Sequence, residues 1–257
     1  MSAPAPGRPR ASAREVRSRP AYPALRAVGA VVTALLVGGA VLSTAPAMMT
    51  QEGVDTAPLP DSMTRLVVEA PRGDVEIHEV PEGGEPRIET TARWTLNRPE
   101  VTTREEGATV HVEAPCDGSN LGVCSQDLSL WVPAGTALVI DGTFGDVDIT
   151  TTGTVEVDVT AGDITLAGAP PRAVIRSTLG QVDVEHTGPE PPELLRVRTT
   201  LGDVGLEVPE GRGYAVTAEA SQGDSPRVRV DDVPGSEHVI DVETTLGSIE
   251  ILPAVTL

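Results

Sequence analysis

The chain of 257 residues contains seven versions of the stretch Thr199-Thr200-Leu201-Gly202-Asp203-Val204. Each version is centred on a glycine: Gly73, Gly145, Gly162, Gly180, Gly202, Gly223 and Gly247. The last five intervals between these glycines are 17, 18, 22, 21 and 24 residues. Intervals of this length are typical of proteins built from stacked structural repeats.

Apolar and polar side chains alternate on both sides of each glycine. In the copy at Gly180, the apolar positions are Ile175 and Leu179 before the glycine and Val182 and Val184 after it. An apolar side chain at every second position predicts a strand with one face in a core and the other in water. We therefore expect the residue directly before each glycine to lie on the core face.

The apolar parity changes at each glycine, from odd offsets before it to even offsets after it. A shift of one residue would turn the side chains to the opposite face unless the backbone bends there. Glycine tolerates such a bend because it adopts positive φ angles, and Asp is a common turn residue. Each copy is therefore predicted to be a strand, a Gly-Asp corner and a second strand.

Two all-β architectures fit this repeat. One is a β-solenoid, in which each copy forms one coil and equivalent residues stack along an axis. The alternative is an antiparallel β-sandwich or meander of bent hairpins. The recurrence of the corner residues favours the solenoid. The uneven spacing of the copies means that the sandwich remains an alternative.

The N-terminal part of the chain has the composition of a membrane anchor. Residues 1–26 are rich in Pro, Ala and Ser and contain six arginines, whereas residues 27–47 carry no charge. A helix over residues 27–47 would be about 31 Å long, close to the thickness of a bilayer core. We predict a disordered cytoplasmic tail over 1–26, a single transmembrane helix over 27–47, a linker over 48–62 and an extracytoplasmic β-repeat domain over 63–257.

A cleaved signal peptide is the alternative to the anchor. Ala45-Pro46-Ala47 has the small-residue spacing of a cleavage site, and cleavage there would leave the domain secreted. With either a membrane anchor or a cleaved signal peptide, the rest of the chain is expected to be exported.

The exported part is strongly acidic. Six of the 19 basic residues and one of the 38 acidic residues lie in the first 26 positions, which leaves a net charge of −24 beyond them. Such a surface repels nucleic-acid phosphates and anionic lipids, so nucleic acid is not an expected partner. It suits cations, basic partners or simple solubility.

The two cysteines, Cys116 and Cys124, are predicted to form a disulfide in the oxidising compartment to which the domain is exported. The surrounding residues 85–135 interrupt the repeat with strands expected around Ile88–Trp94, Thr109–Ala114 and Leu128–Val132. We expect these strands to cap the N-terminal end of the repeats.

A row of carboxylates follows the corner glycines, with members Asp74, Asp146, Asp163, Asp203 and Asp224. In stacked copies these side chains would lie about 4.8 Å apart, and a cation such as Ca²⁺ could relieve their repulsion. Gly-Asp is also ordinary turn chemistry, and that interpretation is the stronger one. No other cofactor or metal site is expected.

A row of hydroxyls lies two residues before the glycines, with members Thr143, Thr160, Thr178, Thr200, Ser221 and Thr245. Strand alternation places this row on the outer face. Stacked β-branched hydroxyls form favourable cross-strand contacts, which is the structural interpretation; contact with glycans or ice is the functional alternative.

No catalytic constellation is recognisable in the sequence. The four histidines, His78, His111, His186 and His238, lack the spacing of a zinc site, and there is no GxSxG motif. A long β-helix could carry a polysaccharide-cleaving pair of carboxylates, but 37 acidic residues beyond the leader make chance pairs unavoidable. We therefore predict a protein that is not an enzyme.

Residues 128–149 (LSLWVPAGTALVIDGTFGDVDI), 155–166 (VEVDVTAGDITL) and 195–209 (LRVRTTLGDVGLEVP) carry a family resemblance. They resemble a family of bacterial "putative adhesin" domains of unknown function, in the repeated TxxGDV unit and in the VPxGxxL step before the first full repeat. The resemblance covers roughly residues 64–252. It implies an exported or membrane-tethered domain with a β-solenoid-like fold, and it implies no catalytic residues.

The leading functional hypothesis is a membrane-anchored, non-enzymatic cell-envelope protein that serves as an adhesin or scaffold surface. Its partner would be an envelope protein or a glycan. A regulatory module that senses envelope stress through a partner is the second hypothesis, and a polysaccharide-active enzyme is the third.

Overall fold

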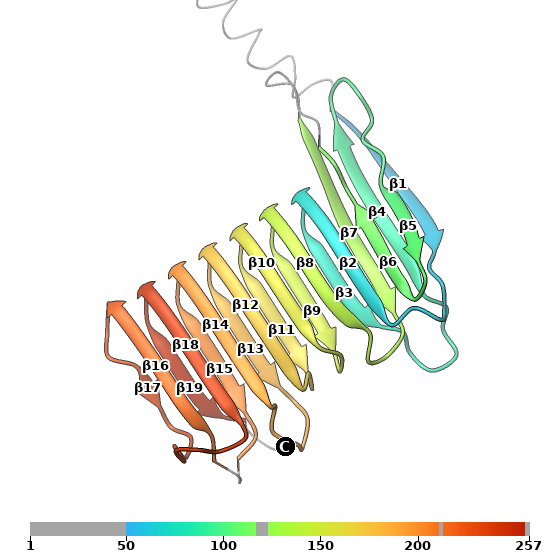
Figure 1. Ribbon diagram of the computed structural model, residues 1–257. Helices are drawn as coiled ribbons and strands as arrows, with labels where there is room; N and C mark the ends of the chain where they lie inside the picture. Colours follow the sequence, from blue (N-terminus) through green and yellow to red (C-terminus); the bar gives the residue numbers. More distant parts are fainter. Residues whose placement is uncertain (1–49, 117–122, 211–212, 255–257) are drawn as a thin grey trace, which may run out of the picture. The chain divides into compact units, whose positions relative to one another are not determined.

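The computed structural model describes residues 50–116, 123–210 and 213–254. The predicted tail and membrane segment, residues 1–47, lie outside the described residues. Within the described ranges, no helix is long and apolar enough to cross a membrane. The regular elements described there are all strands, so the all-β prediction is confirmed (Figure 1).

The described strands form two mixed sheets. In spatial order, the first sheet contains β1 (Gln51–Pro58), β4 (Arg87–Trp94), β7 (Cys124–Val132), β3 (Val75–Glu79), β9 (Val147–Thr151), β11 (Ile164–Gly168), β13 (Val182–His186), β15 (Val204–Val208), β19 (Ile249–Pro253) and β17 (Arg227–Val228). The second sheet contains β16 (Ala215–Gln222), β18 (Val239–Leu246), β14 (Leu194–Leu201), β12 (Arg172–Leu179), β10 (Val155–Ala161), β8 (Ala137–Phe144), β2 (Arg65–Arg72), β6 (Thr109–Glu113) and β5 (Thr102–Glu106).

Each repeat copy contributes one strand to each sheet. The copy at Gly162 places β10 in the second sheet and β11 in the first, and both strands pair in parallel with those of the neighbouring copies. Equivalent residues are in register, for example Val157 with Ile140 and with Ile175. The two layers agree with the sandwich alternative, but the antiparallel pairing it predicts joins only β1 to β4, β4 to β7 and β5 to β6 among the described strands.

The last two copies stack in the reverse of their sequence order. β18 lies between β14 and β16, and β19 lies between β15 and β17, so the copy at Gly247 separates the copy at Gly202 from the copy at Gly223. The outermost strand, β16, has Ala218 and Ala220 where β18 has Val242 and Thr244. Small side chains suit this position because one side of a terminal repeat has no neighbour to cover it.

The N-terminal end of the stack is built from the interrupting strands. β6 and β7 continue the two sheets beyond the copy at Gly73, and β5, β4 and β1 then add antiparallel strands. β1 lies within residues 48–62, which the sequence predicts to be a linker, and it pairs along its whole length with β4. Its seven exposed residues out of eight explain why no alternation marked it as a strand.

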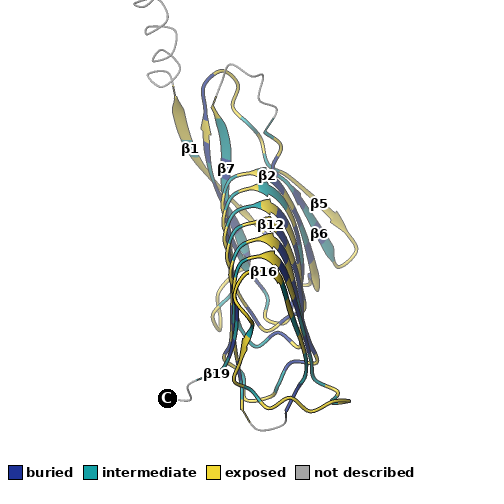
Figure 2. Cartoon of the chain, turned by 90° about the vertical axis from the view of Figure 1, so that its left-hand side faces the viewer, coloured by how far each residue is buried: buried dark blue, intermediate teal, exposed yellow. Residues whose placement is uncertain are grey.

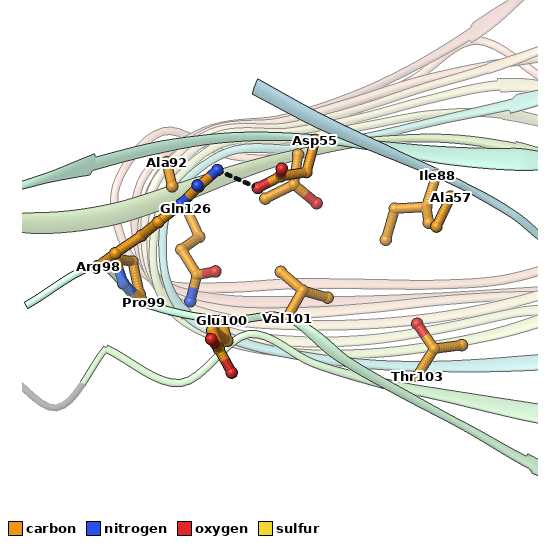
Figure 3. A pocket seen from close by; sticks show the side chains of 11 residues that line it. Asp55, Ala57, Ile88, Ala92, Arg98, Pro99, Glu100, Val101, Thr103 and Gln126 are labelled. Carbon is orange, nitrogen blue, oxygen red and sulfur yellow. Dashed lines mark hydrogen bonds and ion pairs between the residues drawn. The ribbon is translucent and has the colours of Figure 1, made fainter. Parts of the chain in front are cut away.

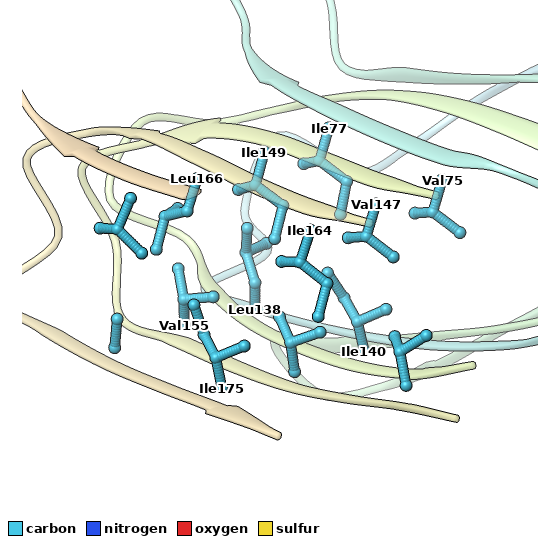
Figure 4. Close-up of a cluster of buried hydrophobic side chains, with 14 of the residues drawn as sticks. Val75, Ile77, Leu138, Ile140, Val147, Ile149, Val155, Ile164, Leu166 and Ile175 are labelled. Atoms are coloured by element: carbon cyan, nitrogen blue, oxygen red, sulfur yellow. The ribbon is translucent and has the colours of Figure 1, made fainter. Parts of the chain in front are cut away.

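The core lies between the two sheets and is made almost entirely of Val, Ile, Leu and Ala. Figure 4 shows the pattern: Ile140 and Ile175 point inward from the second sheet, and Ile149 and Ile164 point inward from the first. Each fully buried Val, Ile or Leu contributes about 1.5–3 kcal/mol of transfer free energy, so the register of the copies is strongly specified.

The corner glycines are required by a close backbone approach as well as by their φ angles. Gly162 has φ +150°, and a Cβ built on it would lie 1.9 Å from the carbonyl oxygen of Gly145 in the preceding copy. Gly73, Gly145, Gly180, Gly202 and Gly247 have similar φ angles, and their Cβ atoms would lie 1.8–2.0 Å from a backbone oxygen. Gly223, in the outermost copy, lacks the positive φ.

Candidate binding site: the corner face

The corners of the copies line up along one edge of the stack, where Figure 2 shows a row of exposed bends. We call this edge the corner face. It consists of four parallel rows, formed by the second and the first residue before each corner glycine, by the glycine itself, and by the residue after it. Each row takes one residue from every copy, so its members repeat at about 4.8 Å.

The residues directly before the glycines form an exposed apolar row, which we call the apolar ridge. Its members are Phe144, Ala161, Leu179, Leu201 and Leu246, and each is in register with its neighbour in the next copy. The exposed fractions are 53% for Phe144, 52% for Leu179, 42% for Leu201 and 49% for Leu246. Arg72 begins the row and Gln222 ends it.

The expectation that these residues lie on the core face is wrong. The third residue before the glycine, Ser177 in one copy, is buried, whereas the next two, Thr178 and Leu179, are both exposed. The alternation therefore breaks before the glycine, and the pairing register passes directly from Ser177 to Leu179. The change from odd to even apolar positions predicts the bend at the glycine, but the bend begins two residues earlier. The residue directly before the glycine therefore points outward.

The hydroxyl row lies beside the ridge. Thr160, Thr178, Thr200 and Thr245 are exposed and Thr143 is half-buried, as strand alternation predicts. The arginines that flank this row on the second sheet bond acidic residues of neighbouring strands: Arg176 with Glu156, Arg196 with Asp241 and Arg198 with Glu243. These three arginines therefore form ion pairs on the outer face of the second sheet. They do not pair with the aspartates of the corner face.

The carboxylates after the glycines form a hydrogen-bonded ladder. An oxygen of Asp74 accepts from the backbone N–H of Asp146 at 2.9 Å, and Asp146 accepts in the same way from Asp163 at 2.9 Å. Asp163 then accepts from the N–H of Gln181 at 2.8 Å, and Asp203 accepts from that of Ser248 at 2.7 Å. Each carboxylate therefore ties its corner to the next copy, where Gln181 and Ser248 fill the aspartate position.

The first member of the ladder, Asp127, is not apparent from the sequence. Its side chain accepts from the N–H of Asp74 at 3.3 Å, which makes Gln126-Asp127 an additional corner. Only the spacing Asp127, Leu128, Leu130 matches the repeat, because no glycine precedes the aspartate. Glycine is dispensable there, since Gln126 begins the row of corners and meets no earlier copy.

Hydrogen bonds from the backbone and the hydroxyl of Ser248 hold the pKa of Asp203 below its usual value of 3.8. The aspartates predicted to form a cation row are thus placed along one edge, and all of them except Asp224 accept a backbone hydrogen bond. Asp224 lies in the outermost copy, where no further copy offers an amide. Among the described residues, no group of three or more His, Cys, Asp or Glu side chains is arranged to hold a metal ion.

The predicted disulfide between Cys116 and Cys124 is confirmed, with a Cα–Cα distance of 5.7 Å. It connects the segment that follows β6 in the second sheet to the start of β7 in the first sheet. The bridge therefore joins the two sheets at the N-terminal end of the stack, and Cys124 lies two residues before Gln126, which begins the additional corner.

Glu79, at the end of β3, binds the loops opposite the corner face. One of its oxygens accepts from Gly135 N at 3.0 Å, Thr152 N at 2.6 Å, Thr152 Oγ1 at 2.7 Å and Thr151 Oγ1 at 3.2 Å. Partial burial raises the pKa of Glu79, but these hydrogen bonds together outweigh it and hold the pKa below 4.5. The carboxylate is a structural acceptor for two loops.

We expect Glu79→Ala to lower the free energy of unfolding by about 2–3 kcal/mol, because it leaves two backbone donors without their charged acceptor. Glu79→Gln keeps an acceptor oxygen in place and is expected to lose less than half of that. Since the folded pKa is lowered, the ionised carboxylate stabilises the fold above about pH 4.5, and this contribution disappears as the pH falls through the folded pKa. Urea unfolding of the three proteins between pH 7 and pH 3 measures both effects; an equal loss in both variants would contradict the assignment.

His186 ends β13 and is 2% exposed. Burial lowers its pKa below 6.5, and backbone hydrogen bonds at Gly188, His186 and Pro170 oppose this in part. A histidine with a lowered folded pKa binds protons more readily in the unfolded chain, so the fold loses stability as the pH drops below 6.5. We expect His186→Leu to flatten the change in unfolding free energy between pH 7.5 and pH 5.5, measured by urea titration. An unchanged slope would exclude this histidine as the cause.

No protein-family model matches this chain, and no curated protein matches it significantly. Solved structures do match in fold comparison. A "putative cell adhesion protein" from Clostridium sporogenes has 12% identity and a TM-score of 0.42, covering 79% of this chain and 100% of its own. "Putative adhesins" from Parabacteroides distasonis (12% identity, TM-score 0.38) and Bacteroides fragilis (9%, 0.34) each cover 80% of this chain and 97% of their own. These proteins carry the adhesin name of the family that the sequence resembles; the function proposed next depends on the residues of this chain.

Proposed function

We propose that this chain is a non-enzymatic protein of the bacterial cell envelope whose exported domain binds a partner along the corner face. The observation that carries the proposal is the apolar ridge. Phe144, Leu179, Leu201 and Leu246 are large apolar side chains, each about half exposed, that belong to one in-register row. Contiguous exposed apolar surface of this kind is typical of interaction sites.

We infer that the repeat copies are coils of a β-solenoid. The parallel, in-register pairing of both strands of each copy supports this interpretation, as does the hydrogen-bonded ladder that joins one corner to the next. A stack of this kind ties each corner to the next by hydrogen bonds, which restricts the motion of the corner face. A rigid face loses little conformational entropy when it binds an extended partner.

The location in the envelope is inferred from the leader and the disulfide. Residues 27–47 suit a single membrane helix with the arginine-rich residues 1–26 on the cytoplasmic side. The disulfide between Cys116 and Cys124 suits an oxidising compartment outside the cytoplasm. The repeat domain would then lie outside the cytoplasm.

A scaffold or adhesin role also agrees with the use of the titratable residues. Glu79 and Asp203 have pKa values lowered by hydrogen bonds to neighbouring loops and copies. Burial lowers the pKa of His186 and raises the pKa of Tyr214 to about 12. These four side chains occur in different parts of the stack.

The chemistry of the corner face favours a partner with apolar and basic groups. The ridge supplies apolar surface, and the carboxylate ladder runs parallel to it two residues further along each copy. Charge complementarity with the ladder raises the rate and the specificity of association more than the affinity. The partner would be an envelope protein or a glycan that carries cationic groups.

Retention of envelope fractions on immobilised full-length protein in lipid nanodiscs tests the proposal. The fractions are wall polymer, soluble envelope proteins and solubilised membrane proteins. We expect the double variant Leu179→Ser and Leu201→Ser to weaken retention of one fraction by roughly tenfold or more, as for central interface residues. The matched control changes Val54 and Leu96 to serine, because they are 58% and 63% exposed but do not belong to the apolar ridge. Retention of no fraction, or equal loss in both double variants, would contradict the proposal.

A further inference from the structure

A cavity of about 320 Å³ lies between the sheets at the N-terminal end of the stack, beyond the copy at Gly73 (Figure 3). β1 and β4 form one wall, and the segment from Arg98 to Val101 forms the other. Its size falls at the lower end of the range for small-molecule sites in proteins. The copies fill the space between the sheets with Val, Ile and Leu, whereas here Ala57, Thr90 and Ala92 leave it open.

One polar side chain in this cavity has an acceptor without a partner. Gln126 is 0% exposed and donates from Nε2 to the carbonyl oxygen of Pro115 at 2.8 Å. This bond fixes the orientation of the amide, because a carbonyl oxygen accepts only from the NH₂ group. Oε1 is then the atom that remains, and it has no hydrogen-bond partner. A buried acceptor without a donor costs about 1–3 kcal/mol.

The other groups around Gln126 define what could supply the donor. Ile88 and Ala92 are 3% and 1% exposed, and Val101 packs partly against the core. These three side chains form an apolar part of the wall beside Gln126, and the cavity is also lined by the polar residues Asp55, Thr90, Arg98, Glu100 and Thr103. Arg98 and Asp55 form an ion pair at the rim, so the guanidinium is already engaged there. A neutral ligand with one donor satisfies Oε1 without giving up the hydration that a charged ligand would lose on entering.

We propose that this cavity binds a small neutral molecule with an apolar body and one hydrogen-bond donor, an O–H or an amide N–H. The donor bonds Oε1 of Gln126, and the apolar body packs against Ile88, Ala92 and Val101. The proposal does not depend on the function proposed for the corner face, although the backbone of Gln126 also begins the row of corners.

Two ring compounds of similar size test the donor requirement. Cyclohexanol carries a hydroxyl donor, whereas cyclohexanone carries only an acceptor, which would face the lone pairs of Oε1. We expect cyclohexanol to shift the NMR signal of the Ile88 δ1 methyl saturably in the full-length chain in nanodiscs. Cyclohexanone is expected to bind roughly tenfold more weakly, because the buried acceptor stays unpaired.

Ala92→Leu provides the control, because it fills the cavity with an apolar side chain and leaves Gln126 unchanged. We expect this variant to keep its thermal stability and to lose the cyclohexanol response. Gln126→Met removes the acceptor, so the two compounds are expected to bind equally weakly to it. The proposal is overturned if the Ile88 methyl does not respond, if it responds equally to both compounds, or if Ala92→Leu responds as the unmodified protein does.

Discussion

Gly162→Ala is expected to lower the free energy of unfolding by about 3–5 kcal/mol, which is large for the addition of one methyl group. The new Cβ would lie 1.9 Å from the carbonyl oxygen of Gly145, and φ at this residue is +150°. Relief of the contact requires the two copies to move apart, which disturbs the hydrogen bond from Gly145 N to Ala161 O at 3.1 Å. Urea unfolding followed by circular dichroism measures the loss.

Gly107→Ala separates the two causes of this effect. Gly107 also has a positive φ, of +67°, but a Cβ built on it meets nothing within 4 Å. We expect this variant to lose only the cost of a left-handed conformation, about 1–2 kcal/mol. A similar loss in both variants would mean that the φ angle alone makes glycine necessary, and that the copies do not approach as closely as described.

Ile175→Ala is expected to cost about 2–5 kcal/mol, whereas Leu179→Ala, four residues along the same strand, should change stability by less than about 0.5 kcal/mol. Ile175 is 0% exposed and belongs to the core, whereas Leu179 is 52% exposed and belongs to the apolar ridge. Both positions are apolar in most copies, so sequence alone gives them equal weight.

Thermal and urea unfolding of the two variants compare them directly. If Leu179→Ala lowered the free energy of unfolding as much as Ile175→Ala, the ridge would belong to the core, as the alternation of apolar residues predicts. It would also remove the basis for a binding role of the corner face.

The repeat unit, its strands and its glycine corners could be predicted from sequence because each leaves a local signal. Alternation marks Ile175 and Val182 as core residues, and the recurring glycine marks the bend between them. The disulfide followed from the presence of two cysteines in an exported chain. These features depend on residues close together in sequence.

The outward orientation of the ridge could not be predicted in this way. The alternation rule assumes a straight strand up to the glycine, but the pairing register passes from Ser177 to Leu179. The position of β1 also left no signal, since most of its side chains are exposed. Asp127 lacks the glycine that identified the other corners, although its side chain joins the same ladder.

The order of the last copies depends on long-range pairing. Sequence order suggests that the copy at Gly223 follows the copy at Gly202, but β18 and β19 occupy the place between them. The sequence of this copy continues as Asp224-Ser225-Pro226, whereas an apolar residue follows the aspartate in the copies at Gly73, Gly145, Gly162 and Gly202. This copy lies at the end of the stack, so no further copy has to pack against its corner.

Disulfide trapping on the apolar ridge tests the in-register corner face most directly. A bridge needs Cα atoms within about 7 Å, which adjacent copies at about 4.8 Å satisfy and copies two steps apart at about 9.6 Å do not. Leu201 is in register with Leu246, and Leu246 is in register with Gln222. Under mild oxidation, the pair Leu201→Cys and Leu246→Cys should form a bridge, found by peptide mapping, and the pair Leu201→Cys and Gln222→Cys should not. A bridge in the second pair and none in the first would contradict both the order of the copies and the ridge they form.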